Sequence, residues 1–332
     1  SFHVTGVQTC ALPISTLIKS TQSIAIIGAG GFLGKHLTKS LSSQIYDLRC
    51  FDHNLIGIDK TEGIQWIEGD ISSSSLIEAI NGCSTVIHLA STSTPSTADK
   101  NISEDAKKNI QSSLHLFDQC AASGVKRIIF ISSGGTVYGS PDIIPTPESA
   151  PTYPITAYGV TKLTIEKYLD IYLRQKDIDY RVLRVSNIYG PLQTAQNGQG
   201  VIASFLSKII NNQPIEIWGD GSITRDYIFV DDVIDAIISC IEDDGPHKIF
   251  NIGSGKGTSI NKIIQLIENT TGVKVQKKLK PGRKVDVKTN ILDCSLANEQ
   301  LKWHPQTSLA DGLKETYTWI KNICRYTNIR RS

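Results

Sequence analysis

Short apolar runs alternate with segments of helical hydrophobic spacing along residues 23–131. The run at residues 23–27 (SIAII) is rich in β-branched side chains and ends in glycines, which is typical of a buried strand. Further strands are predicted at residues 47–52, 63–70, 85–90 and 125–131, and helices between them at residues 32–41, 75–80 and 104–122. Strands that alternate with helices at this spacing predict an α/β fold with a parallel, doubly wound sheet.

The hydrophobic pattern changes near residue 190. Residues 191–200 (PLQTAQNGQG) are polar, and turn-rich segments follow at residues 218–221 and 250–255. We therefore expect residues 22–190 to form a Rossmann-type domain, to which later parts of the chain return. Residues 191–325 should form mainly a smaller C-terminal α/β lobe.

The first residues do not fit this pattern. The stretch at residues 4–14 (VTGVQTCALPI) resembles one reading frame of a common DNA-sequencing adapter, and the sequence contains no methionine. We expect residues 1–15 to be a non-native tail and leave them out of the fold. A genuine disordered tail is the alternative. The stretch lacks the basic region and long apolar core of a signal peptide.

Composition and charge are those of an ordinary globular protein of 332 residues. Hydrophobic residues make up 40% and charged residues 20%, and the net charge of +2 gives no reason to expect nucleic acid or an acidic membrane as a partner. No apolar run reaches the ~18–20 residues of a membrane helix. The seven cysteines form no Cys-x-x-Cys pair and the seven histidines no metal-ligand spacing. We expect reduced thiols, a cytoplasmic protein and no metal site.

A glycine cluster joins the first predicted strand to the first predicted helix. Gly28, Gly31 and Gly34 form the pattern Gly-x-x-Gly-x-x-Gly. In such a loop the first glycine allows a tight turn, the second lets the backbone approach phosphate, and the third allows close helix–strand packing. The N-terminus of the following helix favours an anion, so the cluster predicts a dinucleotide pyrophosphate site rather than a simple turn.

Acidic and apolar residues follow at the ends of the next strands. Asp52 ends the second strand, where a carboxylate can accept hydrogen bonds from both ribose hydroxyls and would repel a 2′-phosphate, which favours NAD over NADP. A solvated loop aspartate is the alternative. Asp70 ends the third strand, where folds of this kind meet the adenine edge. Leu89 and Ala90 end the fourth and should lie along the cofactor.

Tyr158 and Lys162 stand four residues apart in the segment AYGVTK, which places them on one face of a helix. The pKa of a free tyrosine is about 10. Lys162 and the positive nicotinamide ring of NAD⁺ should both lower it by favouring the phenolate, so that Tyr158 can act as a base toward an alcohol. A packed tyrosine and a solvated lysine are the alternative. Downstream of the glycine loop, the pair predicts an NAD-dependent oxidation of an alcohol.

Further sequence blocks accompany the glycine loop and Asp52. They are HLA (88–90), SSGGTVYG (132–139), YGVTK (158–162), RVSNIYGP (184–191), WGDGSITRDYIFVDD (218–232) and FNIGSG (250–255). With these blocks in this order, the chain resembles the extended short-chain dehydrogenase/reductases over about residues 22–320. Within them it is similar to the NAD-dependent nucleotide-sugar epimerases and dehydratases, which include the UDP-glucose 4-epimerases.

The resemblance implies a set of cofactor contacts and a catalytic hydroxyl. NAD would be held by Gly28, Gly31, Phe32, Leu33, Gly34, Asp52, Asp70, Ile71, Leu89, Ala90, Tyr158 and Lys162. The family also supplies a Ser or Thr hydroxyl that shares the substrate's proton, but its usual position holds Gly134 in this sequence. We expect Ser133 or Thr136 to replace it, and favour Ser133.

The same segment distinguishes among reactions of the family. In the dehydratases an acidic pair follows the hydroxyl residue, and in the related decarboxylases a glutamate does so. This chain has Gly135 and Thr136 there. An elimination of water therefore lacks its expected acid, whereas a simple epimerisation needs none.

Three residues of the later blocks match substrate contacts of the family. Arg225 matches an arginine that grips the substrate diphosphate, Arg283 should join it, and Asn187 matches an asparagine beside the diphosphate. The planar guanidinium fork suits that anion because it donates two parallel hydrogen bonds. An ion pair of Arg225 with Asp226 or Asp232 is the alternative.

The leading prediction is therefore a nucleotide-diphosphate-sugar 4-epimerase that acts through a transient 4-keto sugar, with a UDP-hexose as the expected substrate. The alternatives are a nucleotide-sugar dehydratase or decarboxylase, and a non-catalytic NAD-binding sensor or scaffold. The resemblance also implies a homodimer joined by the helices near residues 104–122 and 157–174. An apolar stripe on those helices fits core packing as well.

Overall fold

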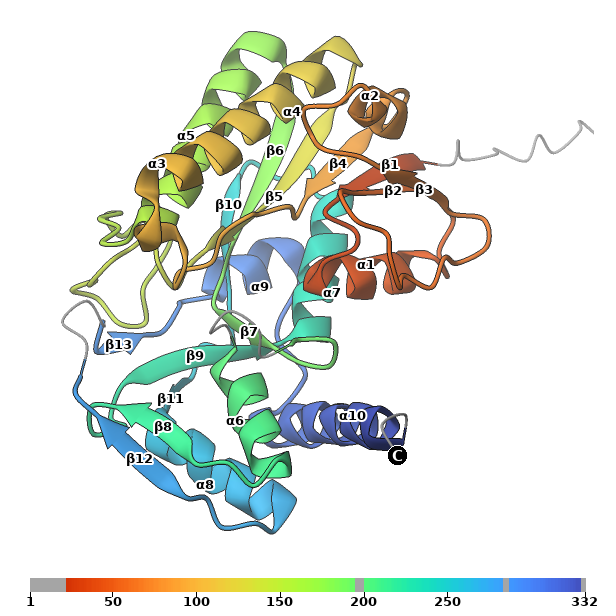
Figure 1. The fold of residues 1–332 in the computed structure, drawn as a ribbon. Coiled ribbons are helices and arrows are strands. Elements are labelled where there is room, and N and C mark those ends of the chain that lie inside the picture. Colours follow the sequence, from red (N-terminus) through yellow and green to blue (C-terminus); the bar gives the residue numbers. More distant parts are fainter. Residues whose placement is uncertain (1–21, 195–199, 283–286, 330–332) are drawn as a thin grey trace, which may run out of the picture.

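A computed structural model describes residues 22–194, 200–282 and 287–329 (Figure 1). The expected non-native tail at residues 1–15 lies outside them. Figure 1 shows a larger upper layer built around one sheet and a smaller lobe below it, formed by later parts of the chain.

The larger layer contains a seven-stranded parallel sheet in the order β10-β6-β5-β4-β1-β2-β3. Its strands are β1 Gln22–Ile27, β2 Tyr46–Asp52, β3 Gln65–Glu68, β4 Thr85–His88, β5 Arg127–Ser133, β6 Asp179–Val185 and β10 Ile249–Ile252. The strand order reverses between β1 and β4, which is the place where ligands bind in open α/β sheets. The predicted doubly wound, Rossmann-type fold is confirmed.

Helices cover both faces of this sheet (Figure 1). On one face, α2 Ser75–Ile80, α4 Ser112–Ala122 and α5 Ala157–Lys176 bury apolar side chains in one cluster. On the other face, α1 Phe32–Leu41 and α7 Val230–Ile241 belong to a second cluster. Strands such as β1 and β5 contain continuous apolar runs because both faces of the sheet are covered by helices, so neither face requires polar side chains. Since α7 and β10 come from beyond residue 190, the chain returns to the first layer, while the boundaries 22–190 and 191–325 stay a prediction.

The helix expected at residues 104–122 is divided. A short 3-10 helix, η1 Ala98–Lys100, is followed by α3 Ile102–Asp105, by a π-helical segment, η2 Ala106–Gln111, and by α4. The Asn109 side-chain amide donates to the Asp105 carbonyl oxygen at 3.0 Å. In a regular α-helix that oxygen would accept the Asn109 backbone N–H. The Asn109 side chain therefore competes with a backbone hydrogen bond of the helix, within the π-helical segment η2.

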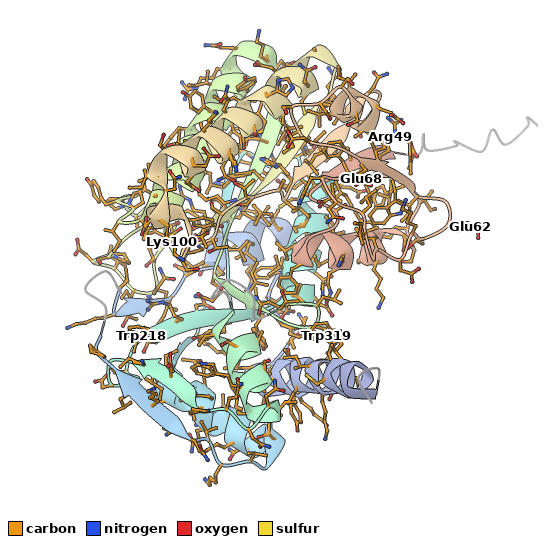
Figure 2. All side chains as sticks on the ribbon, viewed as in Figure 1. Arg49, Glu62, Glu68, Lys100, Trp218 and Trp319 are labelled. Carbon is orange, nitrogen blue, oxygen red and sulfur yellow. The ribbon has the colours of Figure 1, made fainter. Side chains whose placement is uncertain are left out.

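The smaller lobe joins two short sheets to helices. One sheet contains β7 Asn187–Tyr189, β9 Thr224–Phe229, β11 Gly257–Ser259 and β13 Thr289–Asn290, and the other pairs β8 Ile215–Trp218 with β12 Lys277–Lys280. The helices are α6 Val201–Ile210, α8 Ile260–Thr271, α9 Ser295–Leu301 and α10 Leu309–Ile329. Figure 2 shows Trp218 on this lobe, where it is 39% exposed. None of the described helices is long and apolar enough to cross a membrane.

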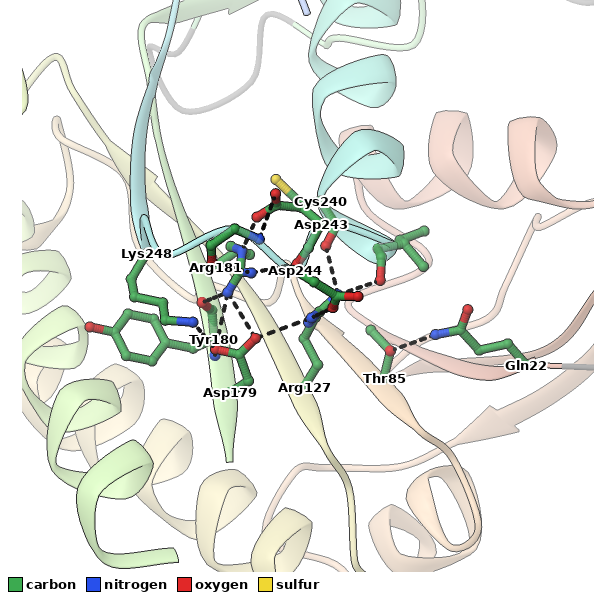
Figure 3. A network of polar contacts seen from close by, with 12 residues as sticks. Gln22, Thr85, Arg127, Asp179, Tyr180, Arg181, Cys240, Asp243, Asp244 and Lys248 are labelled. Atoms are coloured by element: carbon green, nitrogen blue, oxygen red, sulfur yellow. Dashed lines mark hydrogen bonds and ion pairs between the residues drawn. The ribbon is translucent and has the colours of Figure 1, made fainter. Parts of the chain in front are cut away.

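A network of charged side chains holds the amino ends of β5 and β6 (Figure 3). Arg181 is 0% exposed and contacts Asp243 at 2.5 Å and Asp179 at 2.9 Å. Arg127 donates to the Ile241 carbonyl oxygen at 2.6 Å and so satisfies the C-terminus of α7. Because parallel strands share one direction, this network lies at the opposite edge of the sheet from the strand ends that carry the predicted site.

Candidate active site

The glycine loop has the geometry of a phosphate-binding turn. Gly28 has a φ of +94°, and a Cβ atom there would lie 2.7 Å from the Ala90 nitrogen. A Cβ on Gly34 would lie 2.3 Å from the Gly28 carbonyl oxygen, so α1 can approach β1 only with glycine at this position. Gly31 precedes α1 without a side-chain cap, which leaves N–H groups of the first turn, at Phe32 and Leu33, for an anion. The residues present therefore fit the pyrophosphate of a dinucleotide.

The ends of β2, β3 and β4 surround this loop. The Asp52 carboxylate accepts the Gly30 N–H at 2.8 Å and contacts His53 Nδ1 at 2.8 Å, which fixes it beside the turn. The N–H groups of Leu89 and Ala90 donate to the Ile27 carbonyl oxygen at 2.9 and 3.0 Å, so both residues lie against the glycine loop.

Asp70 and Ile71 follow β3, two strands away from β1. Asp70 is exposed, and its carboxylate accepts the N–H and the hydroxyl of Ser72 at 2.8 and 2.6 Å. These hydrogen bonds lower the pKa of Asp70 and keep it ionised. The cofactor roles of Asp70 and Ile71 stay a prediction.

Tyr158 lies in the first turn of α5, a turn that is capped on two sides. Thr156 accepts the Gly159 N–H at 3.2 Å, and Asp99 of η1 accepts the Ala157 N–H at 2.7 Å. Lys162 Nζ donates to the Ile131 carbonyl oxygen at 3.0 Å and lies 5.6 Å from the centroid of the Tyr158 ring. The pair thus stands where β5 ends, at the same edge of the sheet as the glycine loop.

One expectation about this pair is wrong for the protein alone. Burial, followed by the negative charge of Asp105, raises the pKa of Tyr158 to about 12. Burial also lowers the pKa of Lys162 to about 8, against the opposing effects of Asp105 and Glu166. The lysine bonds to the Ile131 carbonyl oxygen instead of the phenol, and burial of the phenol outweighs the effect of its charge.

Gly134, where we expected the family's hydroxyl residue, is closely packed. A Cβ atom there would lie 2.6 Å from Leu292 Cδ1 and 2.9 Å from the Arg184 carbonyl oxygen. The residue is held by its own N–H, which donates to the Val185 carbonyl oxygen at 2.9 Å. A serine or threonine at this position would therefore clash unless its neighbours moved.

The two hydroxyls that flank Gly134 differ in availability. Ser133 Oγ makes no hydrogen bond to another described residue, whereas Thr136 Oγ1 lies 3.5 Å from the Ser133 carbonyl oxygen. A Cβ on Gly159 would lie 2.8 Å from the Thr136 carbonyl oxygen, so the turn packs against the residue after Tyr158. The catalytic roles of both hydroxyls stay a prediction.

A buried polar network under this turn was not anticipated from the sequence. Arg184 donates to Glu166 at 2.7 Å and to the Tyr138 hydroxyl at 3.0 Å, and Tyr138 donates to Asn251 at 2.7 Å. Burial raises the pKa of Tyr138 to about 12, so this phenol stays protonated as a donor. Ser132 completes the network by donating to Glu166. Tyr138 and Arg184 stand in the blocks quoted above, but their spacing gave no sign of a mutual contact.

The predicted substrate residues lie on paired strands of the smaller lobe. Asn187 of β7 stands opposite Tyr227 of β9 and donates to the Asp226 carbonyl oxygen at 3.0 Å. Arg225 donates to the carbonyl oxygens of Thr224 and Val287 at 3.0 and 2.6 Å. Ser133 pairs with Val185, two residues before Asn187, which places the end of β5 beside the start of β7. Arg283 lies outside the described residues.

The acidic neighbours of Arg225 have structural roles of their own. Asp226 is 0% exposed and accepts the N–H and hydroxyl of Ser254 at 2.8 and 2.6 Å, which fixes the turn after β10. Asp232 accepts the backbone N–H of Gln306 at 2.7 Å. Within the described residues, no group of three or more His, Cys, Asp or Glu is arranged to hold a metal ion.

Comparison with known proteins identifies the group to which this site belongs. The sequence profile of the NAD dependent epimerase/dehydratase family matches residues 24–253, a range that includes the glycine loop, Tyr158 and Lys162. The chain belongs to this family. As a family member it is an NAD-dependent enzyme, which confirms the cofactor and the family that the sequence blocks indicated.

Individual family members illustrate what the chain resembles. It is 30% identical over 306 residues to a UDP-glucose 4-epimerase of Mycolicibacterium smegmatis, covering 90% of this chain and 98% of that protein. It is 34% identical over 318 residues to a dTDP-4-dehydro-6-deoxyglucose reductase of Escherichia coli, covering 90% and 97%. A UDP-glucose 4-epimerase of Thermotoga maritima, solved with UDP-glucose, superposes with a TM-score of 0.86 at 34% identity over 91% of this chain and 100% of that one.

Proposed function

We propose that the protein is a nucleotide-diphosphate-sugar 4-epimerase with a UDP-hexose as substrate. One observation carries this proposal: the glycine loop, Asp52 and the Tyr158–Lys162 pair stand at one edge of one sheet, on the two sides of the point where its strand order reverses. This arrangement supports nucleotide binding and proton transfer at a common place, as an alcohol oxidation requires.

NAD⁺, when bound, supplies the acceptor and donor of a hydride at carbon 4 of the sugar. Tyr158 takes the proton of the 4-hydroxyl during oxidation and returns it during reduction. Ser133, whose hydroxyl has no other partner among the described residues, shares that proton. Lys162, fixed by the Ile131 carbonyl oxygen at 3.0 Å, orients the nicotinamide ribose and keeps a positive charge near the phenol.

The diphosphate would be held by the smaller lobe while the sugar turns. Arg225 lies on β9, with its guanidinium oriented by the carbonyl oxygens of Thr224 and Val287. Asn187 lies on the adjacent β7. We assign these two residues, together with Arg283, to the diphosphate. A firmly held diphosphate and a loosely held sugar would let the 4-keto intermediate present either face for reduction.

The residues after Ser133 support an epimerase over an eliminating enzyme. Gly135 and Thr136 provide no carboxylate where the family's dehydratases and decarboxylases have one. A reductase is the second candidate, because the Escherichia coli relative that is 34% identical carries that name. A reductase consumes a reduced cofactor in each turnover, whereas an epimerase restores NAD⁺. A non-catalytic sensor would have no use for the Tyr158–Lys162 pair.

The experiment is incubation of the purified protein with UDP-, dTDP- and GDP-sugars, with and without added NAD⁺ or NADH, followed by product identification. A 4-epimer of a UDP-hexose without net change in NADH supports the proposal. A 6-deoxy-4-keto product, released carbon dioxide, or consumption of one NADH per product contradicts it. Tyr158→Phe is the matched control, since it removes only the hydroxyl.

We further propose a homodimer in a reducing cytoplasm. Val160 and Ile171 of α5 are 48% and 41% exposed, and a second copy of α4 and α5 would cover them in a four-helix arrangement. Six cysteines in the described part of the chain are free thiols, as expected in a reducing compartment. Light scattering at several concentrations tests the dimer, and Val160→Glu should dissociate it.

A further inference from the structure

A buried carboxylate stands beside the first turn of the catalytic helix. Asp105, at the end of α3, is 5% exposed. One of its oxygens accepts the Thr161 hydroxyl of α5 at 2.6 Å, and the other accepts the Asn109 amide at 3.0 Å. Within the described residues no cationic side chain forms an ion pair with it. Hydrogen bonds therefore support its charge directly, and Lys162 interacts with it from beyond ion-pair distance.

The same carboxylate connects the helix to the loop after β4. Asn109 uses its amide oxygen to accept the N–H and the hydroxyl of Thr92, at 2.9 and 3.2 Å. It also donates to the Ser93 hydroxyl at 3.2 Å. Thr92 follows the strand end at Leu89 and Ala90, which lies against the glycine loop. Asp105 and Asn109 thus link the loop after β4, at Thr92, to α5, at Thr161, through hydrogen bonds.

Thr161 occupies an informative position on α5. It follows Tyr158 by three residues and directly precedes Lys162, so a bond to its hydroxyl restrains the helical turn that carries both residues. We propose that Asp105 is a positioning residue that fixes the catalytic turn through Thr161 and holds a negative charge beside Tyr158. This inference rests on the proposed function, in which Tyr158 is the base.

Few other titratable groups lie near Tyr158 and Lys162. Tyr158 faces Lys162 on its own helix, and Glu166 lies one turn beyond, paired with Arg184. Asp99 contacts the start of the helix at the Ala157 N–H. His88 of β4 faces Lys162, but burial and that lysine lower the pKa of His88 to about 3, so it is neutral.

Asp105 therefore opposes ionisation of Tyr158 and helps to keep Lys162 charged. Its charge is the second cause, after burial, of the raised pKa of Tyr158, and it counteracts the lowered pKa of Lys162. The phenol would then give up its proton only when a positive nicotinamide ring lies against it. Deprotonation of Tyr158 would therefore depend on the presence of the oxidised cofactor.

The test is the pH dependence of kcat/KM for Asp105→Asn, in the protein as isolated with its cofactor. The amide is isosteric and can bond to both Thr161 and Asn109, but it lacks the charge. We expect the acid limb of the profile to move to lower pH by on the order of one unit. The ultraviolet titration of tyrosinate, taken as the difference from Tyr158→Phe, should move in the same direction and does not depend on turnover.

Thr161→Val is the matched control, because it removes the anchor and keeps the charge. It should lower kcat and leave the acid limb in place. A folded Asp105→Asn variant whose acid limb and tyrosinate titration coincide with the wild type would overturn the inference. If that variant does not fold, Asp105→Ser, which also lacks the charge, answers the same question. A wild-type protein inactive on all nucleotide sugars would refute the proposed function instead, and the tyrosinate titration would still test Asp105.

Discussion

Gly134 and Leu292 are in contact across 157 intervening residues of sequence, with a Cβ on the glycine placed 2.6 Å from the leucine Cδ1. Leu292 is 0% exposed and packs with Val137 and Tyr138, so it has little room to withdraw. The contact gives a packing reason for glycine at the position where the resemblance predicts a hydroxyl residue.

Replacing Gly134 with serine should therefore harm the protein although it restores the family's residue. Overpacking of a buried site typically costs about 1–3 kcal/mol, and we expect Gly134→Ser to lower the free energy of unfolding by that amount. Gly135→Ser is the control, since a Cβ on Gly135 has its nearest neighbour, Ser133 Oγ, at 3.8 Å. Denaturant titration of both variants compares them, and equal stabilities would contradict the packing argument.

Removal of the proposed proton-sharing hydroxyl should slow turnover without changing stability. Ser133→Ala is expected to lower kcat by about 10²-fold, the size typical of a lost proton-transfer group. Thr136→Ala should have a smaller effect because its hydroxyl is directed at the Ser133 carbonyl oxygen. Steady-state kinetics on a UDP-hexose measure both. A larger loss for Thr136→Ala would reverse the assignment, and no loss in either would exclude both residues.

The Asp52 carboxylate should contribute to cofactor affinity through its remaining hydrogen-bonding capacity. Hydrogen bonds to charged groups contribute about 1.5–3 kcal/mol, so Asp52→Asn should weaken NAD⁺ binding by roughly 10–100-fold in calorimetry. His53→Ala is the control. Its ring is 81% exposed, and its loss leaves the carboxylate and the Gly30 contact in place. Equal NAD⁺ affinities for Asp52→Asn and the wild type would show that the cofactor ribose does not bind to Asp52.

The ion network at the amino ends of the strands should matter for stability and not for catalysis. Arg181→Met leaves Asp243 without its buried partner, and breaking a buried ion pair typically costs about 3–5 kcal/mol. Asp179 keeps its ion pairs with Arg127 and Lys248. Arg174→Met, which removes an exposed ion pair with Asp170, should cost no more than about 1 kcal/mol. Thermal unfolding measures both. A folded Arg181→Met protein with normal stability would show that the network is not a structural support.

The strands β1 to β5 could be predicted from the sequence because β-branched runs and helical spacing are local properties, whereas β6 and β10 were not predicted. The bounds of α1 and α2 agree with the expectation at residues 32–41 and 75–80. The π-helical turn could not be predicted, because it depends on an Asn109 amide that takes over a backbone acceptor. Short-range patterns do not report such a competition.

The candidate site likewise combines features that local sequence predicts with features that depend on contacts between distant residues. The spacing predicts that Tyr158 and Lys162 share a helix face, but it does not predict that the lysine donates to the Ile131 carbonyl oxygen. Burial then raises the pKa of Tyr158, opposite to the effect expected from the lysine alone. The reason for Gly134 lies in Leu292 and Arg184, both distant in sequence. Properties that depend on such contacts need the folded chain.

The central claim is that hydride leaves carbon 4 of a nucleotide sugar and returns to the same carbon. UDP-glucose labelled with deuterium at carbon 4, incubated with the protein in ordinary water, tests it most directly. The account predicts that substrate and 4-epimer both keep the label at carbon 4, with no net NADH formed or consumed. Deuterium found at carbon 6 of a deoxy sugar, or lost from carbon 4 in an epimerised product, would contradict it.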